Sequence, residues 1–167
     1  MEAKKEMLTL INGCIEAALD DLYDKDSHLL LYRVHERTIV FRFGLYLQNK
    51  LDAYEVFNQY NLDFEYNRNG RQPKRIPARS RNGAYPDLII HRRGSNTHNL
   101  LVMEFKPYWE RNVYDDCNKI LQFIDENGEY KYQFGKSIIL GENRQSVIVK
   151  TFTQQQAEEG DGIMFES

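Results

Sequence analysis

Two neighbouring stretches decide the fold: Tyr85-Pro86-Asp87-Leu88-Ile89-Ile90-His91 and Leu100-Leu101-Val102-Met103-Glu104-Phe105-Lys106. Each is a run of branched and aliphatic residues, and the segment between them is polar, which predicts two strands joined by a hairpin or short meander. Because side chains alternate across a sheet, Glu104 and Lys106 share one face. Proline tends to stand at the start of a strand, so Asp87 opens the first strand beside the end of the second. Asp87 and Glu104 are therefore expected to converge.

These two carboxylates and the lysine form a candidate metal site. Carboxylates in close approach repel each other unless a cation lies between them, and oxygen ligands without nearby His or Cys favour Mg²⁺, for which Mn²⁺ can substitute. Lys106 adds a positive charge that would orient or deprotonate a water, or stabilise the charge that develops on a phosphoryl group. The alternative is a sheet edge with ordinary charged residues, since strands that end in Glu-x-Lys are common.

Pro86-Asp87, followed seventeen residues later by Glu104-Phe105-Lys106, resembles the motif of the PD-(D/E)XK nuclease superfamily, which has the restriction-endonuclease-like fold. The core of that family is a helix, a three-stranded meander that carries the motif, a second helix and further strands. The resemblance implies an Mg²⁺-dependent endonuclease that hydrolyses DNA phosphodiesters and leaves 5′-phosphate and 3′-hydroxyl ends. It also implies roles for individual residues. Asp87, Glu104 and the Phe105 carbonyl would bind one or two metal ions, Glu36 would be a further ligand, direct or through water, and Lys106 would position the attacking water.

The hydrophobic periodicity predicts elements in the same order as that core. They are an amphipathic helix over 4–22, a helix over 31–52, strands over 62–66, 86–92 and 100–106, a helix over 113–125, and strands over 136–140 and 146–152. We therefore expect one α/β domain over residues 1–153, with a central mixed sheet of about five strands flanked by helices. The acidic segment 154–167 is expected to be a flexible tail or a contact for a partner.

Three charged residues on the predicted helices need separate interpretation. Glu36 lies on the same helical face as Ile39 and Val40, so its carboxylate is expected at the head of the stripe that packs on the sheet. The alternative is an ordinary glutamate near a helix start, which the helix dipole favours. Asp116 and Lys119 are three residues apart on the later helix, and an exposed ion pair is their simpler interpretation. Lys119 is also a candidate phosphate contact.

Residues 68–81 form a basic segment in a chain whose net charge is −3. The segment has six Lys or Arg and no acidic residue, whereas the chain from residue 151 onward has four acidic residues and no basic one. Its Gly and Pro predict a long loop that would hold a phosphate backbone over the metal site, and the alternative is a solvated surface loop. The candidate nucleic-acid contacts are Arg71, Lys74, Arg75, Arg79 and Arg81.

Length and composition set limits on the class of protein. A chain of 167 residues with eleven Tyr and nine Phe is expected to fold as one domain with a substantial core. No apolar run approaches the length of a membrane span, and the N-terminus lacks the features of a signal peptide, so we expect a cytoplasmic protein that does not contact membranes. Cys14 and Cys117 have no ligand spacing and are expected to be buried and reduced.

Two other functions stay open at this point. One is a catalytically silent nucleic-acid-binding or assembly subunit of the same fold, and loss of the motif carboxylates would be its sign. The other is a metal-free interaction protein, which only the acidic tail supports. For the nuclease, DNA is expected as the substrate in preference to RNA. A homodimer would allow both strands of a duplex to be cut.

Overall fold

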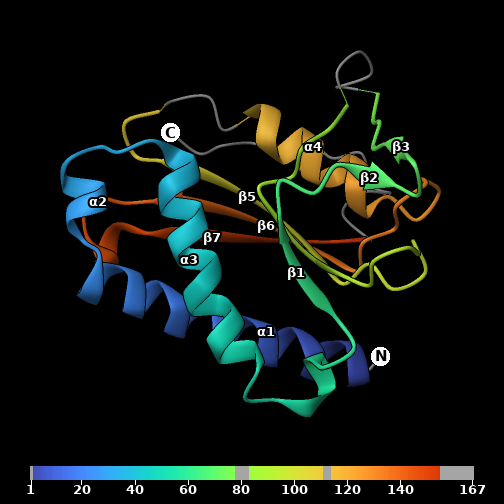
Figure 1. The fold of residues 1–167 in the computed structure, drawn as a ribbon, viewed down its shortest axis with the longest axis horizontal. Helices are drawn as coiled ribbons and strands as arrows, with labels where there is room; N and C mark the ends of the chain where they lie inside the picture. The colour runs from blue at the N-terminus through green and yellow to red at the C-terminus, as the bar shows by residue number, and fades with distance from the viewer. Residues whose placement is uncertain (1, 78–82, 111–113, 155–167) are drawn as a thin grey trace.

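The central feature of the fold is a five-stranded mixed sheet with helices on both faces (Figure 1). The computed structural model describes residues 2–77, 83–110 and 114–154. The sheet has the strand order β1-β4-β5-β6-β7, in which only the β5–β6 pair is parallel. Its strands are β1 (Asn61–Phe64), β4 (Leu88–His91), β5 (Leu101–Pro107), β6 (Phe134–Leu140) and β7 (Ile148–Thr153). The predicted α/β class and the number of strands are confirmed.

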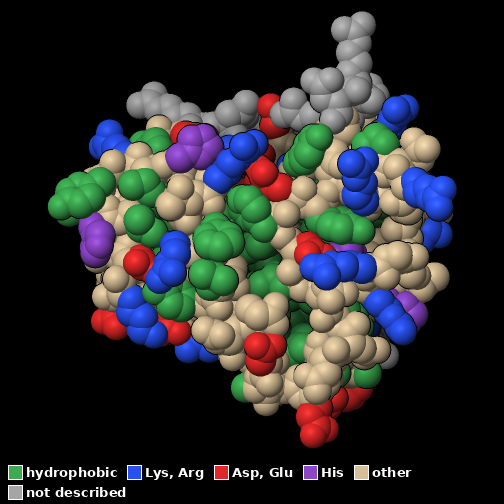
Figure 2. Space-filling model, in the orientation of Figure 1, with side chains coloured by type: hydrophobic (Ala, Val, Ile, Leu, Met, Phe, Trp, Pro, Cys, Tyr) green, Lys and Arg blue, Asp and Glu red, His purple; other side chains and the backbone are tan. Residues whose placement is uncertain are grey.

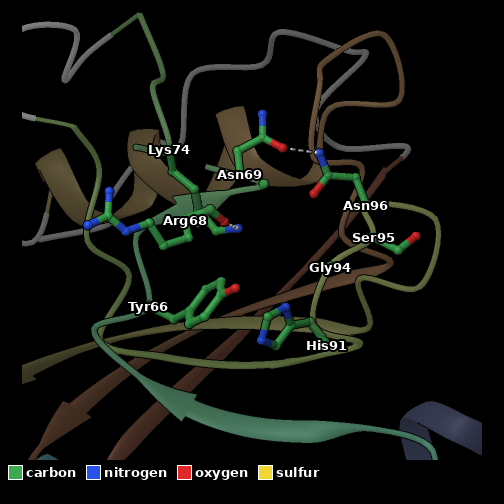
Figure 3. A pocket seen from close by; sticks show the side chains of 9 residues that line it. Tyr66, Arg68, Asn69, Lys74, His91, Gly94, Ser95 and Asn96 are labelled. Atoms are coloured by element: carbon green, nitrogen blue, oxygen red, sulfur yellow. Dashed lines mark hydrogen bonds between the residues drawn. The ribbon is translucent and has the colours of Figure 1, made fainter. Parts of the chain in front are cut away.

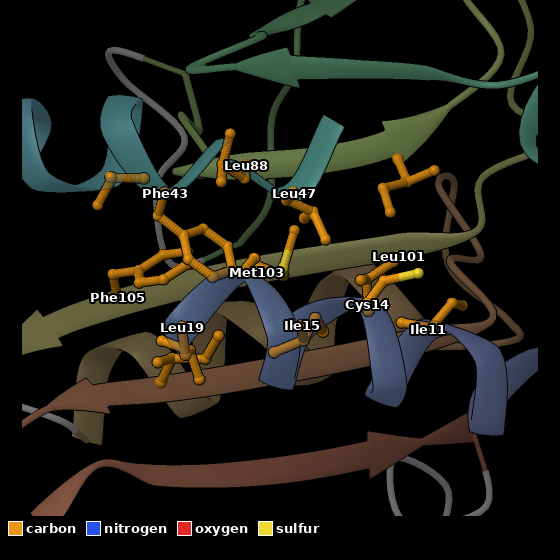
Figure 4. Close-up of a cluster of buried hydrophobic side chains, with 14 of the residues drawn as sticks. Ile11, Cys14, Ile15, Leu19, Phe43, Leu47, Leu88, Leu101, Met103 and Phe105 are labelled. Atoms are coloured by element: carbon orange, nitrogen blue, oxygen red, sulfur yellow. The ribbon is translucent and has the colours of Figure 1, made fainter. Parts of the chain in front are cut away.

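The helices divide between the two faces of the sheet. They are α1 (Glu2–Lys25), α2 (His28–Leu31), α3 (Glu36–Leu51) and α4 (Tyr114–Ile124), with single 3₁₀ turns η1 (Glu55–Phe57) and η2 (Arg144–Ser146). On β5, Leu101, Met103 and Phe105 belong to the core that includes α1 and α3 (Figure 4). Val102 faces the other way, into a core formed with α4. The alternation expected for this strand is therefore confirmed, and it places Glu104 and Lys106 on the side of α4.

The helix predicted over 31–52 begins later, at Glu36, because the chain turns sharply after α2 ends at Leu31. Arg33 has φ of 50°, in the left-handed region that an α-helix of L-residues avoids. His35 then caps α3, since its Nδ1 accepts a hydrogen bond from the backbone N–H of Arg37 at 3.3 Å. Glu36 is consequently the first residue of α3 and lies near the end of the sheet that carries the motif.

The basic segment was expected to be a loop, but part of it is a small hairpin. Strands β2 (Arg68–Asn69) and β3 (Gln72–Pro73) pair antiparallel, and the turn between them contains Gly70 with φ of 57°, which glycine adopts without steric cost. The hairpin lies on the same side of the sheet as α4 (Figure 1). Arg79 and Arg81 fall outside the described residues, as does the acidic tail from residue 155.

The edge strand β1 lies beside an apolar surface on α3. Phe41 and Leu45 are 52% and 43% exposed, and with Leu62 and Phe64 they line a shallow groove of about 150 Å³. Figure 2 shows apolar side chains gathered in the middle of the face that contains this surface. The homodimer expected from the sequence stays a prediction.

Two smaller expectations concern the cysteines and the membrane. Cys14 and Cys117 are both buried and neither forms a disulfide bond, as expected. In the described part of the chain, none of the helices combines the length and the apolar composition that a membrane span requires.

Candidate active site

Asp87 and Glu104 converge, and the strand register explains why. β4 and β5 pair with Leu88 opposite Met103, so the next residue on each strand, Asp87 and Glu104, are neighbours at the end of the ladder. Asp87 Oδ2 accepts a hydrogen bond of 2.7 Å from the backbone N–H of Phe105. Glu104 is 2% exposed. Both carboxylates lie on the α4 side of the sheet, and they converge as the sequence predicted.

Lys119 contacts Glu104 directly, so its interpretation as part of an exposed ion pair is wrong. Its Nζ lies 2.8 Å from Glu104 Oε2 and also donates a hydrogen bond to the carbonyl of Tyr85. The side chain is only 14% exposed. Lys119 is one residue before Ile120, which is fully buried against the sheet. Lys119 therefore lies at the edge of the apolar stripe that packs α4 on the sheet, and from there its ammonium reaches the Glu104 carboxylate.

Lys106 is surrounded by three carboxylates from three elements. Its Nζ lies 3.5 Å from Glu36 Oε2 on α3, 3.4 Å from Glu110 Oε2 after β5, and 3.4 Å from Asp116 Oδ2 on α4. Figure 2 shows acidic and basic side chains side by side in the region where α3 and α4 approach each other in Figure 1. The sequence predicted Glu36 at this site. Asp116 was interpreted as part of an exposed ion pair with Lys119, which is wrong, since its position four residues before Ile120 places it on the buried side of α4.

The carboxyl groups of this cluster hold their protons more tightly than usual. Burial raises the pKa of Asp87 to about 6, against the stabilising hydrogen bond from the Phe105 amide. Burial and the nearby Asp87 raise the pKa of Glu36 to about 7. Burial and Asp87 also raise the pKa of Glu104, and Lys119 only partly offsets them. Bringing these carboxylates together therefore lowers the free energy of unfolding at neutral pH, and pKa shifts of this kind are typical of functional sites.

For the Lys106 ammonium, neighbouring charges favour the charged form. Burial works against its charge, but the carboxylates of Asp116, Glu36 and Glu110 outweigh that effect and raise its pKa. Lys106 is therefore protonated at neutral pH. The sequence left two kinds of role open for Lys106. The charged form favours a hydrogen-bond donor, which orients a water or stabilises negative charge, and not a base that removes a proton.

The carboxylates of the site are groups that bind divalent cations, although they are not arranged around one in this structure. Among the described residues, no three carboxylate, imidazole or thiolate side chains are positioned to hold a metal ion as they stand. In this arrangement the Lys119 ammonium neutralises one oxygen of Glu104. The other oxygen, Oε1, is buried and has no hydrogen-bond partner among the described residues. A buried carboxylate oxygen without a partner, beside the second carboxylate of Asp87, is suited to bind a hard cation.

Lys119 is expected to hold the metal-free site together. Lys119→Met should lower the free energy of unfolding in EDTA by about 3 kcal/mol, because removing one partner of a buried pair leaves the other charge uncompensated. Chemical denaturation at neutral pH measures this. The double variant Lys119→Met, Glu104→Gln should recover most of the loss, and Mn²⁺ should stabilise Lys119→Met more than the wild type. A single variant as stable as the wild type would contradict this role.

The predicted nucleic-acid contacts divide into three groups. Arg71 and Arg75 are exposed on and after the hairpin, as expected. Lys74 is only 1% exposed and donates a hydrogen bond of 2.9 Å to the carbonyl of Arg68, so it does not lie on a solvated surface loop, and its contact with a phosphate stays a prediction. The side chain of Lys74 points into the protein, because successive side chains of an extended segment point in opposite directions. Arg79 and Arg81 lie outside the described residues.

Comparison of the chain with models of protein families, with curated proteins and with solved structures found no match, so the proposals below rest on the residues of this chain.

Proposed function

We propose that this protein is a metal-dependent endonuclease that hydrolyses phosphodiester bonds of DNA, with a core of the restriction-endonuclease-like type. One observation carries the proposal. Asp87, Glu104 and Lys106 lie at one end of adjacent strands and on one face, as the PD-(D/E)XK motif requires. The mixed sheet, with β5 and β6 parallel and α4 between them in the chain, supports the same assignment.

Asp87, Glu104 and the backbone carbonyl of Phe105 would hold Mg²⁺ or Mn²⁺. When bound, the ion supplies a Lewis acid for the scissile phosphate and neutralises the charge that develops on it. Asp87 is already oriented for this purpose, because the Phe105 amide fixes one of its two oxygens. Glu104 is held from the other side by Lys119. A ligand role for Glu36 stays a prediction, since its nearest charged partner is Lys106.

Lys106 would donate hydrogen bonds to the attacking water and to the phosphate. Its ammonium is fixed by Glu36 and Asp116, which come from helices on opposite faces of the sheet, so it has little freedom to turn away. Preorganised donors of this kind lower the barrier because no reorganisation is needed as charge develops. Glu36, with a pKa of about 7, is suited to accept the proton that the water loses.

The second candidate is the catalytically silent subunit of the same fold. The observation that favours it is the ion pair of Lys119 with Glu104, which neutralises a carboxylate without any metal. All four charged positions of the motif are nevertheless present, so we rank the nuclease first.

A cleavage assay decides between the two. Purified protein should be incubated with supercoiled, linear, single-stranded and branched DNA in Mg²⁺ or Mn²⁺, with Glu104→Gln as the matched inactive control. Cleavage by the wild type, with 5′-phosphate ends and none by the control, is expected. Binding of DNA without cleavage of any substrate in either metal would favour the silent subunit, and absence of both would reject a nucleic-acid function.

The exposed arginines of the hairpin region are expected to bind phosphates and not to read bases. Replacing Arg71 and Arg75 with Gln should weaken binding to all DNA sequences alike and reduce the slope of log affinity against log salt by about two, because each lost contact releases one fewer counterion. The control is the double variant Lys5→Gln, Lys25→Gln on α1, which packs on the opposite face of the sheet. An unchanged slope in the arginine variant would show that these residues do not contact the substrate.

A further inference from the structure

A polar pocket lies between the hairpin and the far end of β4. It has a volume of about 220 Å³, and the described residues that line it include no carboxylate. Figure 3 shows Tyr66 and His91 on one side of it and Asn69 and Asn96 on the other. His91 is the last residue of β4, whereas Asp87 precedes the first, so the pocket is separated from the candidate active site by about 13 Å along the strand.

Lys74 is the unusual residue of this pocket. It is only 1% exposed, yet no carboxylate of the described residues lies within ion-pair distance of its ammonium. The Nζ donates to the carbonyl of Arg68 and lies 5.3 Å and 5.2 Å from the ring centres of Tyr66 and Tyr130. Buried lysines are rare unless they are paired with an anion, because burial removes the hydration of the charge. Here burial lowers the pKa of Lys74 to about 8.

The two acidic residues near the pocket already have other partners. Asp63 accepts a hydrogen bond of 2.8 Å from His91 Nε2 and is also paired with Arg93, and these contacts outweigh burial and lower its pKa. Glu129 accepts a hydrogen bond from the side chain of Asn69. Neither carboxylate therefore serves as a counterion in contact with Lys74.

The rest of the lining also suits an anion. The exposed Arg68 stands at the rim and adds a second positive charge. Asn69 and Asn96 form the opposite wall and are joined by a hydrogen bond of 2.9 Å, which Asn96 donates. Ammonium and guanidinium groups are donors with which proteins bind phosphate oxygens.

We propose that this pocket binds a phosphomonoester group, with Lys74 as its buried counterion and Arg68 at its rim. A phosphomonoester carries a charge of about −1.5 to −2 at neutral pH, which the two cations match better than they match the single charge of a phosphodiester. Binding of the phosphate group itself does not depend on the proposed function. That the phosphate belongs to the end of a nucleic-acid strand does rest on it.

The first experiment titrates inorganic phosphate into the full chain in EDTA, by calorimetry at constant ionic strength. Saturable binding with a dissociation constant of about 1 mM or tighter is expected. Lys74→Met should weaken it more than ten-fold and Arg68→Gln by about ten-fold, the effect of one charge-assisted hydrogen bond. Arg92→Gln is the matched control, because Arg92 is exposed beside His91 but does not line the pocket. Its affinity should equal that of the wild type.

Two results would overturn the proposal: no saturable phosphate binding by the wild type, or Arg68→Gln and Lys74→Met variants that bind as the wild type does. Should Lys74→Met fail to fold, as shown by its circular dichroism, Arg68→Gln decides, since that side chain is exposed and forms no hydrogen bond or ion pair with the described residues.

The source of the phosphate is tested with a 5′-phosphorylated oligonucleotide, its 5′-hydroxyl counterpart and a mononucleotide. A terminal nucleic-acid phosphate predicts that the phosphorylated oligonucleotide binds more tightly than both others, and that Arg68→Gln removes the difference. A mononucleotide that binds as tightly as the phosphorylated oligonucleotide assigns the pocket to small phosphorylated molecules. Phosphate binding should persist in Asp87→Asn. A failure of the proposed nuclease function can therefore be distinguished from a failure of the proposed phosphate site.

Discussion

Replacing Asp87 with Asn should abolish metal binding and lower cleavage by on the order of 10³ or more, while making the metal-free protein more stable. The loss of activity follows because Asp87 is a proposed ligand, and a neutral amide is a much weaker ligand for Mg²⁺ than a carboxylate. The gain in stability follows because Asp87 is buried beside Glu104 and raises the pKa of that carboxyl group. The Asn side chain can still accept the hydrogen bond from the Phe105 amide.

The stability gain of Asp87→Asn should depend on pH with a defined sign. The pKa of Asp87 rises from 3.8 to about 6 on folding, so the folded protein binds the proton more tightly than the unfolded chain. The free energy of unfolding of the wild type therefore falls as pH rises from about 4 to 6, by roughly 2 to 3 kcal/mol for this group. Above pH 6 the variant should exceed the wild type by about that amount. Below pH 4 the two should converge, because the wild-type carboxyl is then neutral.

Chemical denaturation in EDTA between pH 3.5 and 8 measures this effect, and calorimetric titration with Mn²⁺ measures binding. Asp125→Asn, on a carboxylate outside the cluster, is the control and should change neither quantity. Equal Mn²⁺ binding by the wild type and Asp87→Asn would remove the metal site from the proposal. A variant that is less stable than the wild type at pH 8 would contradict the strain that burial of this carboxylate implies.

Lys106→Met should lower the cleavage rate by on the order of 10² or more and leave DNA affinity nearly unchanged. Its ammonium is proposed to act on the charge that develops during the reaction, and the loss of one such donor costs about this much. Because Lys106 also neutralises Glu36 and Asp116, the variant should lose stability as well. Single-turnover cleavage at saturating enzyme separates the chemical step from folding and from binding.

The control for Lys106→Met is Lys106→Arg, which keeps the positive charge but replaces the compact ammonium by a larger planar group. It should restore most of the stability and little of the rate. If Lys106→Met cleaves as fast as the wild type, the lysine is a structural counterion of Glu36 and Asp116 and takes no part in catalysis.

The strands and the motif were predictable because their signals are local. The alternation of β5 follows from the period of a strand, so the faces of Glu104 and Lys106 were correct from the sequence alone. The same holds for α4, whose apolar stripe has the helical period. The positions at which elements end were less predictable. The break before α3 and the end of β1 depend on Arg33 and Glu65, with φ of 50° and 47°, and such conformations leave no sure mark in residue type.

For the charged residues too, some relations were predictable from the sequence and others were not. The sequence by itself determined that Asp87, Glu104 and Lys106 share one end and one face of the sheet, because strand parity and the step between the two strands fix that relation. Which lysine neutralises which carboxylate was decided only by the tertiary structure. Lys119 meets Glu104, and Asp116 meets Lys106, because α4 packs on the sheet at an angle and height that its own sequence does not specify. Burial of Lys74 was likewise decided only when the hairpin folded over Tyr66 and Tyr130, since a basic side chain in a polar segment looks solvated until its neighbours in space are known.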